Sequence, residues 1–445
     1  MPIPPELARA CDDTALAGDG DTIGGRQARY VAAPASTEEA SALLRAAAAL
    51  GLTVVPRGAG RLQHWGNPPD SCDLIVDTRR LNRIIEHRTA DFTVTVQAGV
   101  LWSDLAQAVE AGRQWLPLLP RRHARLGTVG GLIAANAGGR RRDRLGSVHD
   151  RLTAVTAVRA DGTVVRSADG GRVAGQDLVT LFAGSYGSLG LITEATFRLE
   201  PLPGISGGVS VPCDDPEHAA RLVTEVSDSS IAPSGIQLRW PAVDQPLSLL
   251  VMIDGVRPEY DARWARVHAL AGRTDVSLPD RDNAIRLDAP DNGGLPPAVA
   301  EKLRAQRERI NAELRDPPPD TGTLLLVTIP PGRLAWALTV IRRAAADSEV
   351  AAAIGGSAGA GVLEVTVPEE SPAAAVARFA AALRAELAGL SAPGNARVTV
   401  VYAPAEVRDL TDTHGPLPSL ALVLAVKDEL DPEHRMAPGR IADPV

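Results

Sequence analysis

The chain has 445 residues, the length of about three domains at roughly 150 residues each, so a single compact core is not expected. Apolar residues make up 45% and charged residues 22%, and the formal net charge is −8, which is ordinary for a globular protein and argues against a general nucleic-acid binder. No apolar run approaches the roughly 20 residues that span a bilayer, no signal peptide is visible, and the three scattered cysteines form neither a disulfide framework nor a Cys-x-x-Cys pair. We therefore expect a cytoplasmic protein of several domains, with no transmembrane segment and no nucleic-acid partner.

The first half of the chain alternates short strands and helices. Residues 1–25 are polar and weakly patterned, so we expect a loosely held N-terminal arm before a first domain of residues 26–203. Ser36-Thr-Glu-Glu39 has the form of a capping box and predicts the start of a helix. Asp161-Gly162 joins two alternating runs and predicts a hairpin over Leu152–Arg166. The other elements predicted in this half are strands at Leu52–Pro56, Asp73–Asp77, Thr93–Ala98 and Gly190–Leu199, and helices at Ser103–Glu110 and Asp177–Ala183.

The pattern changes after Pro201-Leu-Pro-Gly204, where we place a domain boundary. The elements that follow repeat the order strand–helix–strand–strand–helix–strand, which is typical of a split βαβ unit, an antiparallel sheet with helices on one face. The predicted strands are Gly208–Val211, Gly235–Arg239, Leu247–Ile253, Thr323–Ile329, Gly361–Val367 and Ala396–Val401, and the predicted helices are Glu217–Val226, Ala262–Ala271, Val299–Leu314, Gly332–Ala345 and Ala373–Leu387.

A glycine-rich loop, Pro56-Arg-Gly-Ala-Gly-Arg-Leu62, directly follows a predicted strand. Gly58 and Gly60 permit backbone conformations that point successive N–H groups at one anion, as in a phosphate-binding nest. A Rossmann dinucleotide site does not fit, because Gln63 stands where the third glycine of G-x-G-x-x-G belongs and the stretch after it cannot open a helix. Taken alone, the loop could equally be an ordinary turn.

Two further glycine motifs follow. In Thr128-Val-Gly-Gly-Leu-Ile-Ala-Ala-Asn-Ala-Gly-Gly139, Thr128 can cap a helix of small residues, which something can approach closely. The N-terminus of that helix would also offer N–H donors and a partial positive charge to an anion, although tight packing on another helix is the alternative. Gly184-Ser-Tyr-Gly-Ser-Leu-Gly190 is a turn that feeds a strand, and its alternative is an ordinary connecting loop.

In this order, the three motifs resemble the FAD-binding domain of the vanillyl-alcohol-oxidase-type flavoproteins, an α+β fold distinct from the Rossmann fold. The resemblance covers about Val31–Pro203 and includes Gly146-Ser-Val-His-Asp-Arg-Leu152. It resumes at the end of the chain, where Lys427-Asp-Glu-Leu-Asp-Pro432 and Ala437-Pro-Gly-Arg440 are similar to the family's closing segment, with Ala437 in place of the usual Asn.

The resemblance implies an α+β protein with a two-subdomain FAD-binding fold. It also implies a cap or substrate domain over residues 204–425 that carries the antiparallel sheet, and a segment, 426–445, that returns to the FAD domain. Within the family the chain is most similar to the FAD-binding subunit of bacterial glycolate oxidase, on the features Gln63-His-Trp-Gly66, Gly171-Arg-Val-Ala-Gly-Gln-Asp177 and Gly356-Ser-Ala-Gly-Ala-Gly-Val362.

The resemblance also implies which residues contact FAD. The first loop would wrap the pyrophosphate through main-chain N–H groups, the second motif would lie against the diphosphate and the flavin, and the remaining glycines would complete the cleft. Arg61 stands where covalent relatives carry a flavin-linking His, so we expect noncovalent FAD. The expected contacts are Arg57, Gly58, Ala59, Gly60, Arg61, Leu62, Thr128, Gly130, Gly131, Asn136, Ala137, Gly138, Gly146, Gly190 and Ile192.

Flavoproteins of this kind usually take a hydride from a carbon that bears OH while a base takes the hydroxyl proton. The resemblance therefore implies an FAD-dependent oxidoreductase acting on the CH–OH group of a small hydroxylated substrate, with a 2-hydroxy acid such as glycolate as a candidate. No catalytic base can be assigned, because His64, His123 and His149 lie near the motifs but are individually more typical of structural or solvent-facing residues. The arginine runs 121–125 and 140–144 could hold a substrate carboxylate or form a solvated surface.

Two other functions stay open. The paired-His metal motif of the D-2-hydroxyacid dehydrogenase relatives is absent, so we expect no metal site. That absence favours a flavin-binding subunit of a hetero-oligomeric oxidase complex, with catalysis or electron exit on a partner subunit or an electron-acceptor protein. The remaining hypothesis is a cofactor-free binding or scaffold protein that kept the fold and lost FAD.

Overall fold

The computed structural model describes residues 2–118, 120–121, 124–139, 146–167, 172–173, 176–256, 258–271, 322–388, 396–417 and 419–440. The chain divides into two compact units. The first comprises Met1–Gly139, Gly146–Leu202 and Pro416–Val445, and the second comprises Arg140–Leu145 and Pro203–Gly415. The chain thus leaves the first unit close to the boundary predicted after residue 203 and returns to it earlier than the predicted residue 426.

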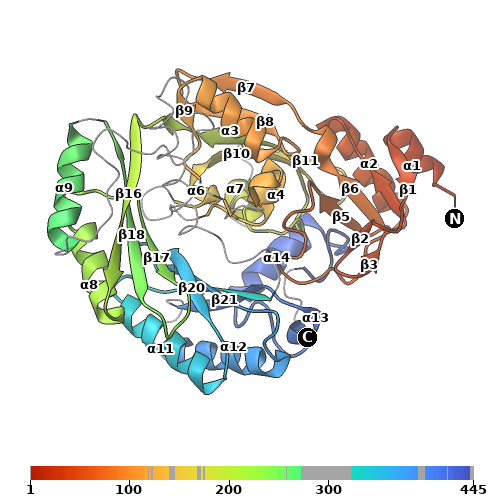
Figure 1. The fold of residues 1–445 in the computed structure, drawn as a ribbon. Coiled ribbons are helices and arrows are strands. Elements are labelled where there is room, and N and C mark those ends of the chain that lie inside the picture. The colour runs from red at the N-terminus through yellow and green to blue at the C-terminus, as the bar shows by residue number, and fades with distance from the viewer. Residues whose placement is uncertain are drawn as a thin grey trace. The chain divides into compact units, whose positions relative to one another are not determined.

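A four-stranded sheet forms one part of the first unit (Figure 1). Its strands lie in the order β1 (Thr14–Leu16), β4 (Tyr30–Ala32), β6 (Leu74–Asp77) and β5 (Val54–Arg57). β4, β6 and β5 are parallel, and β1 is antiparallel to β4. Helix α2 (Thr37–Ala49) begins at the predicted cap, because the Ser36 hydroxyl accepts the N–H of Glu39 at 3.1 Å. The Glu39 carboxylate accepts the N–H of Ala35 at 2.7 Å, one residue further back than in the standard capping box.

A second sheet in this unit is antiparallel and has five strands. Their order is β11 (Val164–Arg166), β10 (Leu152–Val158), β14 (Leu191–Arg198), β8 (Thr93–Gln97) and β7 (Ile84–Arg88). β10 pairs with β11 across a turn in which Gly162 has φ +83°, so the predicted hairpin is confirmed. Ser41 of α2 donates to the Gly162 carbonyl at 2.5 Å, which joins that helix to this sheet.

Shorter elements connect the strands of the first unit. The helices are α3 (Trp102–Ala111), α4 (Val129–Ala134), α6 (Val148–Arg151) and α7 (Leu178–Phe182), with 3-10 turns at Thr78–Arg80 and Ala124–Leu126. Three two-stranded pairs are β2 (Thr22–Ile23) with β3 (Arg26–Gln27), β9 (Gln114–Trp115) with β15 (Glu200–Pro201), and β12 (Arg172–Val173) with β13 (Gln176–Asp177).

The N-terminal segment is packed, and the prediction of a loosely held arm is wrong. Helix α1 (Pro5–Ala10) buries Leu7 completely, and Cys11 is 1% exposed. Both side chains join the core under α2 and the four-stranded sheet. The polar composition of this segment conceals two apolar anchors, and burial raises the pKa of the Cys11 thiol to about 11.

A buried ion pair holds the C-terminal return of the chain. On α14 (Leu420–Leu430), Lys427 Nζ lies 2.6 Å from Asp431 Oδ2 and donates to the carbonyls of Ser188 at 2.7 Å and Met436 at 2.9 Å. The Asp431 carboxylate, which is fully buried, accepts the main-chain N–H groups of Arg435 and Met436. Every ammonium hydrogen and both carboxylate oxygens therefore have partners, so this pair can be buried without an unmet charge.

The residues after this pair extend the four-stranded sheet. The Val54 N–H in β5 donates to the Arg435 carbonyl at 2.8 Å, and the Ala437 N–H donates to the Val54 carbonyl at 2.8 Å. Met436 thus forms a short parallel bridge at the free side of β5. The closing segment is consequently part of the layer that carries the first glycine loop.

The second unit is built on one seven-stranded antiparallel sheet with helices along one face, as predicted (Figure 1). The strand order is β16 (Ile205–Cys213), β18 (Leu247–Gly255), β17 (Gly235–Trp240), β20 (Ala353–Ser357), β21 (Val362–Val367), β19 (Thr323–Thr328) and β22 (Arg397–Tyr402). The helices are α8 (Pro216–Ser227), α9 (Glu259–Ala271), α11 (Leu334–Asp347), α12 (Ala373–Ala388) and the short α13 (Ala405–Arg408).

The two halves of this sheet share one connectivity. β19, α11, β20, β21, α12 and β22 form a split βαβ unit, and β16, α8, β17, β18 and α9 repeat its first five elements. The halves join where the second strand of each, β17 and β20, pair antiparallel. The sequence did not predict β20, because Gly355 and Gly356 lie in it and glycine is depleted in strands. The predicted helix at Val299–Leu314 lies outside the described residues.

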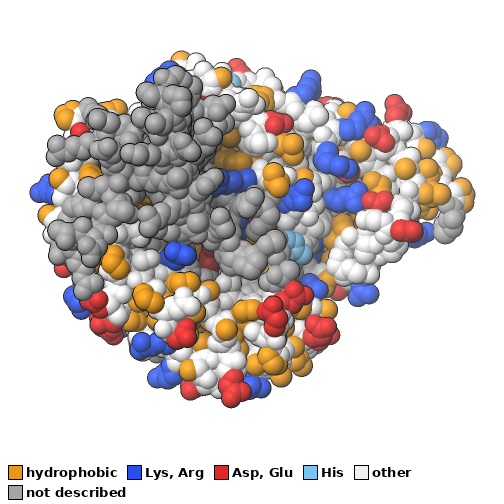
Figure 2. Space-filling model, in the orientation of Figure 1, with side chains coloured by type: hydrophobic (Ala, Val, Ile, Leu, Met, Phe, Trp, Pro, Cys, Tyr) orange, Lys and Arg blue, Asp and Glu red, His pale blue; other side chains and the backbone are white. Residues whose placement is uncertain are grey.

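Two observations concern the helices and the surface of the part of the chain that the structure describes. There, no helix is both long enough and apolar enough to cross a bilayer. On the face shown in Figure 2, acidic and basic side chains are interspersed, in keeping with the modest net charge.

Replacing Lys427 with Met should lower the free energy of unfolding by about 3–5 kcal/mol, because Asp431 would keep a buried charge without a partner. Urea unfolding followed by circular dichroism measures this change. Arg9→Met is the matched control, since Arg9 meets Glu6 at 3.8 Å on an exposed helix and its loss should cost no more than about 1 kcal/mol. Equal effects of the two variants would contradict the importance of the buried pair.

Candidate functional site

Four segments of the first unit supply most of the wall of one cavity, which Thr78 and Ala98 complete. It encloses about 710 Å³ of empty space, part of which is open solvent. The segments are the loop after β5, the stretch from Gly127 through α4, the turn before β14, and the closing segment. The lining residues predicted from the sequence are Gly58, Ala59, Gly60, Arg61, Leu62, Thr128, Gly130, Gly131, Gly190 and Ile192. The three glycine motifs, far apart in the sequence, therefore meet at one place.

The loop after β5 brings unpaired main-chain donors to this cavity. Among the described residues, none accepts a hydrogen bond from the main-chain N–H groups of residues 59–62. Gly60 has φ +72°, a left-handed conformation that glycine adopts without strain. A Cβ added at Gly58 would lie 2.1 Å from the Thr128 hydroxyl oxygen, so the loop can approach the cap of α4 only with glycine there. Successive unpaired N–H groups in such a loop are what an anion-binding nest requires.

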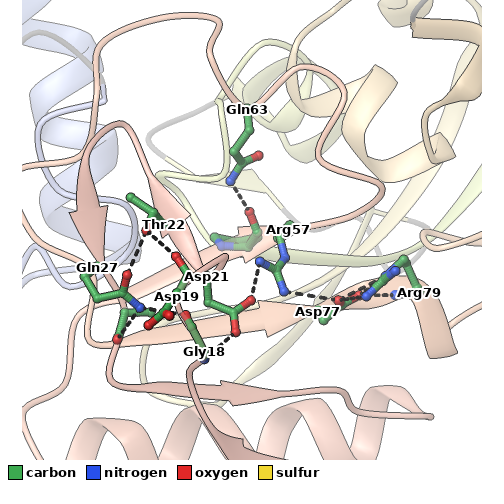
Figure 3. A network of polar contacts seen from close by, with 11 residues as sticks. Gly18, Asp19, Asp21, Thr22, Gln27, Arg57, Gln63, Asp77 and Arg79 are labelled. Carbon is green, nitrogen blue, oxygen red and sulfur yellow. Dashed lines mark hydrogen bonds and ion pairs between the residues drawn. The ribbon is translucent and has the colours of Figure 1, made fainter.

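An ion-pair network fixes the start of the loop (Figure 3). Arg57 lies between Asp21 at 2.8 Å and Asp77 at 3.6 Å, and Asp77 also meets Arg79 at 2.6 Å. The main-chain N–H of Gly18, at 2.9 Å, and the Arg57 guanidinium lower the pKa of Asp21. The Asp21 carboxylate therefore stays ionised and helps to keep Arg57 in place.

Arg57 itself is not among the residues that line the cavity, and its predicted direct contact with FAD stays a prediction. Its guanidinium is committed to the two carboxylates, so it positions the loop. The far end of the loop is held by Gln63, whose side-chain amide donates to the Pro56 carbonyl at 3.0 Å (Figure 3).

The N-terminus of α4 offers no free donors in its first turn, contrary to the sequence prediction. The N–H groups of Val129 and Gly130 donate to carbonyls in the segment after β8, at 2.8 and 2.7 Å. The Gly131 N–H donates to the Thr128 hydroxyl at 3.3 Å, which confirms the predicted cap. A Cβ added at Gly130 would lie 2.8 Å from the Ala98 Cβ. This glycine therefore lets α4 pack against the end of β8.

The turn before β14 completes the opposite side of the wall with Tyr186, Gly187 and Gly190. Gly190 has φ +153°, and a Cβ there would lie 2.7 Å from the Val158 carbonyl oxygen. Tyr186 has φ +51°, a strained conformation for a bulky residue, and its N–H donates to the Ala134 carbonyl of α4 at 2.8 Å. The third motif is thus tied directly to the second.

Four other predicted contacts lie off the cavity wall: Asn136, Ala137, Gly138 and Gly146. Asn136 has φ +46° just after α4, where such a conformation ends a helix. A Cβ on Gly138 would lie 2.9 Å from the main-chain nitrogen of the first residue of α6, and one on Gly146 would lie 2.7 Å from the Asp150 side chain in the same helix. The structure thus shows that these two glycines pack against α6. The spacing of glycines in the sequence does not distinguish such packing positions from positions that line the cavity.

The closing segment contributes a side chain that the sequence did not single out. Arg440 is 2% exposed and lines the cavity. Its Nη1 donates to the Gln63 carbonyl at 3.1 Å, its Nη2 donates to the Trp65 carbonyl at 2.7 Å, and its guanidinium carbon lies 5.9 Å from the centre of the Tyr186 ring. Its Nε has no hydrogen-bond partner among the residues that the structure describes, and burial lowers the pKa of Arg440 to about 10. The Ala437-Pro-Gly-Arg440 motif pointed to this segment but not to the role of its last residue.

The ionisable side chains on the described wall are Arg61, Tyr186 and Arg440. His64 and His149 lie off it. Within the described part of the chain, no three His, Cys, Asp or Glu side chains are grouped so that they could hold a metal ion. The groups that this wall offers to a ligand are therefore main-chain N–H donors and the cationic side chains of Arg61 and Arg440.

This donor set fits a dinucleotide that carries a diphosphate. The glycines keep Cβ atoms out of the cavity, and the unpaired N–H groups and the buried guanidinium suit anionic oxygens. Leu62, Leu132 and Ile192 give the same wall apolar patches against which a planar ring system can pack.

Comparison with known proteins identifies the domain. Residues 28–168 match the model of the FAD binding domain family. The chain is 32% identical to glycolate oxidase subunit GlcD of Bacillus subtilis over 50% of this chain and 46% of that protein. It is 31% identical to a D-lactate dehydrogenase of Anaerostipes hadrus over 45% of this chain and 42% of that protein. It thus spans about half the length of these curated relatives.

A solved structure shows the same fold over nearly the whole chain. The structure of p-cresol methylhydroxylase with substrate bound aligns with a TM-score of 0.69 over 98% of this chain and 95% of that one, at 16% sequence identity. The predicted α+β fold and FAD as the cofactor are thereby confirmed. Residues 28–168 thus match the FAD binding domain family, and the fold of the chain is that of p-cresol methylhydroxylase.

Proposed function

We propose that the protein is an FAD-dependent oxidoreductase that acts on the CH–OH group of a small hydroxylated substrate, with 2-hydroxy acids such as glycolate as the substrate class. The observation that carries the proposal is the convergence of three glycine motifs and the closing segment on one cavity in the unit that matches the FAD binding domain. The names of the relatives, a glycolate oxidase subunit and a D-lactate dehydrogenase, favour 2-hydroxy acids.

In this proposal the main chain holds the cofactor. The N–H groups of residues 59–62 donate to the diphosphate, and Arg57 keeps the loop in position through its ion pairs. Gly190 and Ile192 bound the cleft on the side of β14. Bound FAD supplies the two-electron acceptor for the substrate hydride. Arg61 lies on the wall where covalent relatives carry a linking His, so FAD is held without a covalent bond.

The substrate carboxylate is assigned to the arginines that flank α4. In the run 121–125, Arg121 is 6% exposed, and Arg125 Nε donates to the Pro120 carbonyl at 2.9 Å. His123 and the run 140–144 lie outside the described residues. Bidentate binding of the carboxylate by an arginine of these runs stays a prediction, and the general base stays unassigned.

A second candidate is a flavin-binding subunit of a hetero-oligomeric oxidase complex. The Bacillus subtilis relative is itself named as a subunit, which favours this alternative. In that case the catalytic or electron-exit site lies on a partner, and the chain alone carries the flavin without turning over substrate.

Anaerobic addition of glycolate or D-lactate to the FAD-loaded protein should bleach the flavin absorbance near about 450 nm, because the transferred hydride reduces the flavin. Acetate, which lacks the hydroxyl, is the matched control and should leave the spectrum unchanged. Bleaching by the chain alone supports the first candidate, and bleaching only after a partner is added supports the second. A purified protein that is colourless and takes up no FAD would contradict both candidate functions. The hypothesis of a cofactor-free binding or scaffold protein would then remain.

Replacing Gly60 with Asp should weaken FAD binding far more than replacing it with Asn. Both residues must adopt φ +72° there, a conformation that Asp and Asn tolerate better than other side chains, so the comparison isolates the charge. The carboxylate would face the diphosphate, and one such repulsion is expected to cost at least about tenfold in Kd. Isothermal titration with FAD measures it. Equal dissociation constants for the two variants would place the diphosphate elsewhere.

Replacing Gly130 with Ala should lower both stability, by about 1–3 kcal/mol, and FAD affinity, because the new methyl would meet the Ala98 Cβ at 2.8 Å and displace α4. A second change, Ala98→Gly, removes that contact and should recover part of both losses. Urea unfolding and FAD titration of the single and double variants test this. A double variant no better than the single one would show that the clash is not the cause.

A further inference from the structure

Arg440 is a buried cation for which the described residues supply no acidic partner. It is 2% exposed, and its guanidinium carbon lies 5.9 Å from the centre of the Tyr186 ring. Lys427, another buried cation of the same C-terminal segment, meets Asp431 at 2.6 Å. Because a buried charge is costly unless an opposite charge or full hydrogen bonding compensates it, Arg440 needs an explanation that Lys427 does not.

The hydrogen bonds of Arg440 leave part of its guanidinium unused. Nη1 and Nη2 each donate to one carbonyl, those of Gln63 and Trp65, while Nε is buried and has no partner in the described parts of the chain. An arginine offers five N–H donors in a rigid fork, so the two carbonyls fix its orientation without exhausting it. Arg440 is one of the residues that line the cavity, so a ligand bound there would lie beside a guanidinium with unused donors.

The two carbonyls belong to the segment that directly follows the unpaired donors of residues 59–62. One cavity therefore combines residues whose N–H groups have no acceptor within the described parts of the chain with a fixed guanidinium that meets no carboxylate there. Both features call for an anion with several oxygens. Within FAD, the diphosphate is the group with that chemistry.

We propose that Arg440 is the counter-charge of the cofactor and donates a hydrogen bond from Nε to an anionic oxygen of the FAD diphosphate. The inference rests on the proposed function only in that FAD is the ligand of this cavity. It makes the closing segment a part of the cofactor site, since the same segment bridges to β5 next to the first glycine loop. Burial lowers the pKa of Arg440 to about 10 in the protein alone, and a bound anion would raise that pKa again.

The test compares FAD and ADP binding by isothermal titration in the full chain and in Arg440→Met, which keeps the length of the side chain and removes the charge. Both ligands should bind about 10–100-fold more weakly to the variant, because both carry the diphosphate. Arg435→Met is the matched control: Arg435 is 8% exposed in the same segment and donates to the Ala160 carbonyl, but it does not line the cavity. Its dissociation constants should stay within about twofold of the unchanged protein.

Arg440→Lys separates the charge from the structural tie to the loop. It keeps a cation but cannot hold two carbonyls in one plane, so recovery of most of the lost affinity supports the proposal. If Arg440→Lys binds FAD and ADP as weakly as Arg440→Met does, the hydrogen bonds to the Gln63 and Trp65 carbonyls, and not the charge, account for the loss of affinity. That result would overturn the proposal. A loss for FAD without a loss for ADP, or equal losses in Arg435→Met, would overturn it as well. Failure of the unchanged protein to bind FAD would instead refute the proposed function.

Discussion

The site depends on hydrogen-bond donors that the protein leaves unpaired in a loop that it holds rigidly. The first turn of α4 follows the usual rule that main-chain N–H groups find partners, since all of its N–H groups have acceptors within the protein. Residues 59–62 lie in a half-buried to exposed loop, and their N–H groups have no acceptor among the described residues although both ends of the loop are fixed, one by the ion pairs of Arg57 and the other by the amide of Gln63. A fixed loop with unmet donors is preorganised for an anion, because binding need not reorder the chain.

The C-terminal segment is joined to the first glycine loop and to the sheet that carries it. The Lys427–Asp431 pair anchors α14 to the Ser188 carbonyl in the third glycine motif, and the residues after it bridge to β5. Arg440 then reaches the carbonyls that follow the first loop. Segments separated by almost the whole length of the sequence are thus joined through buried charges, so the cofactor site and the fold of the first unit stabilise each other.

Much of the fold could be predicted from the sequence because its signals are local. The capping box at Ser36, the Asp161-Gly162 hairpin and the alternating strands each appear within a few residues, and the order of the glycine motifs points to the flavoprotein fold. The errors arise where tertiary packing overrides composition. Leu7 anchors a segment of polar composition, and two glycines in β20 conceal a strand that joins the halves of the large sheet.

For the candidate site, too, the sequence does not show which residues tertiary packing brings to the cavity. Gly58 and Gly138 look alike in the sequence, yet one lines the cavity and the other packs against α6. The role of Arg440 depends on which carbonyls and rings surround it, and those come from distant parts of the chain. A motif therefore predicts that a segment belongs to the site, while only the structure shows which of its atoms face the ligand.

Amide hydrogen exchange with and without FAD tests the central claim most directly. The account predicts that saturating FAD slows exchange at residues 59–62, whose N–H groups would gain acceptors, while the first turn of α4 changes far less because its N–H groups already have partners. Unchanged exchange at residues 59–62 with FAD bound would contradict the account.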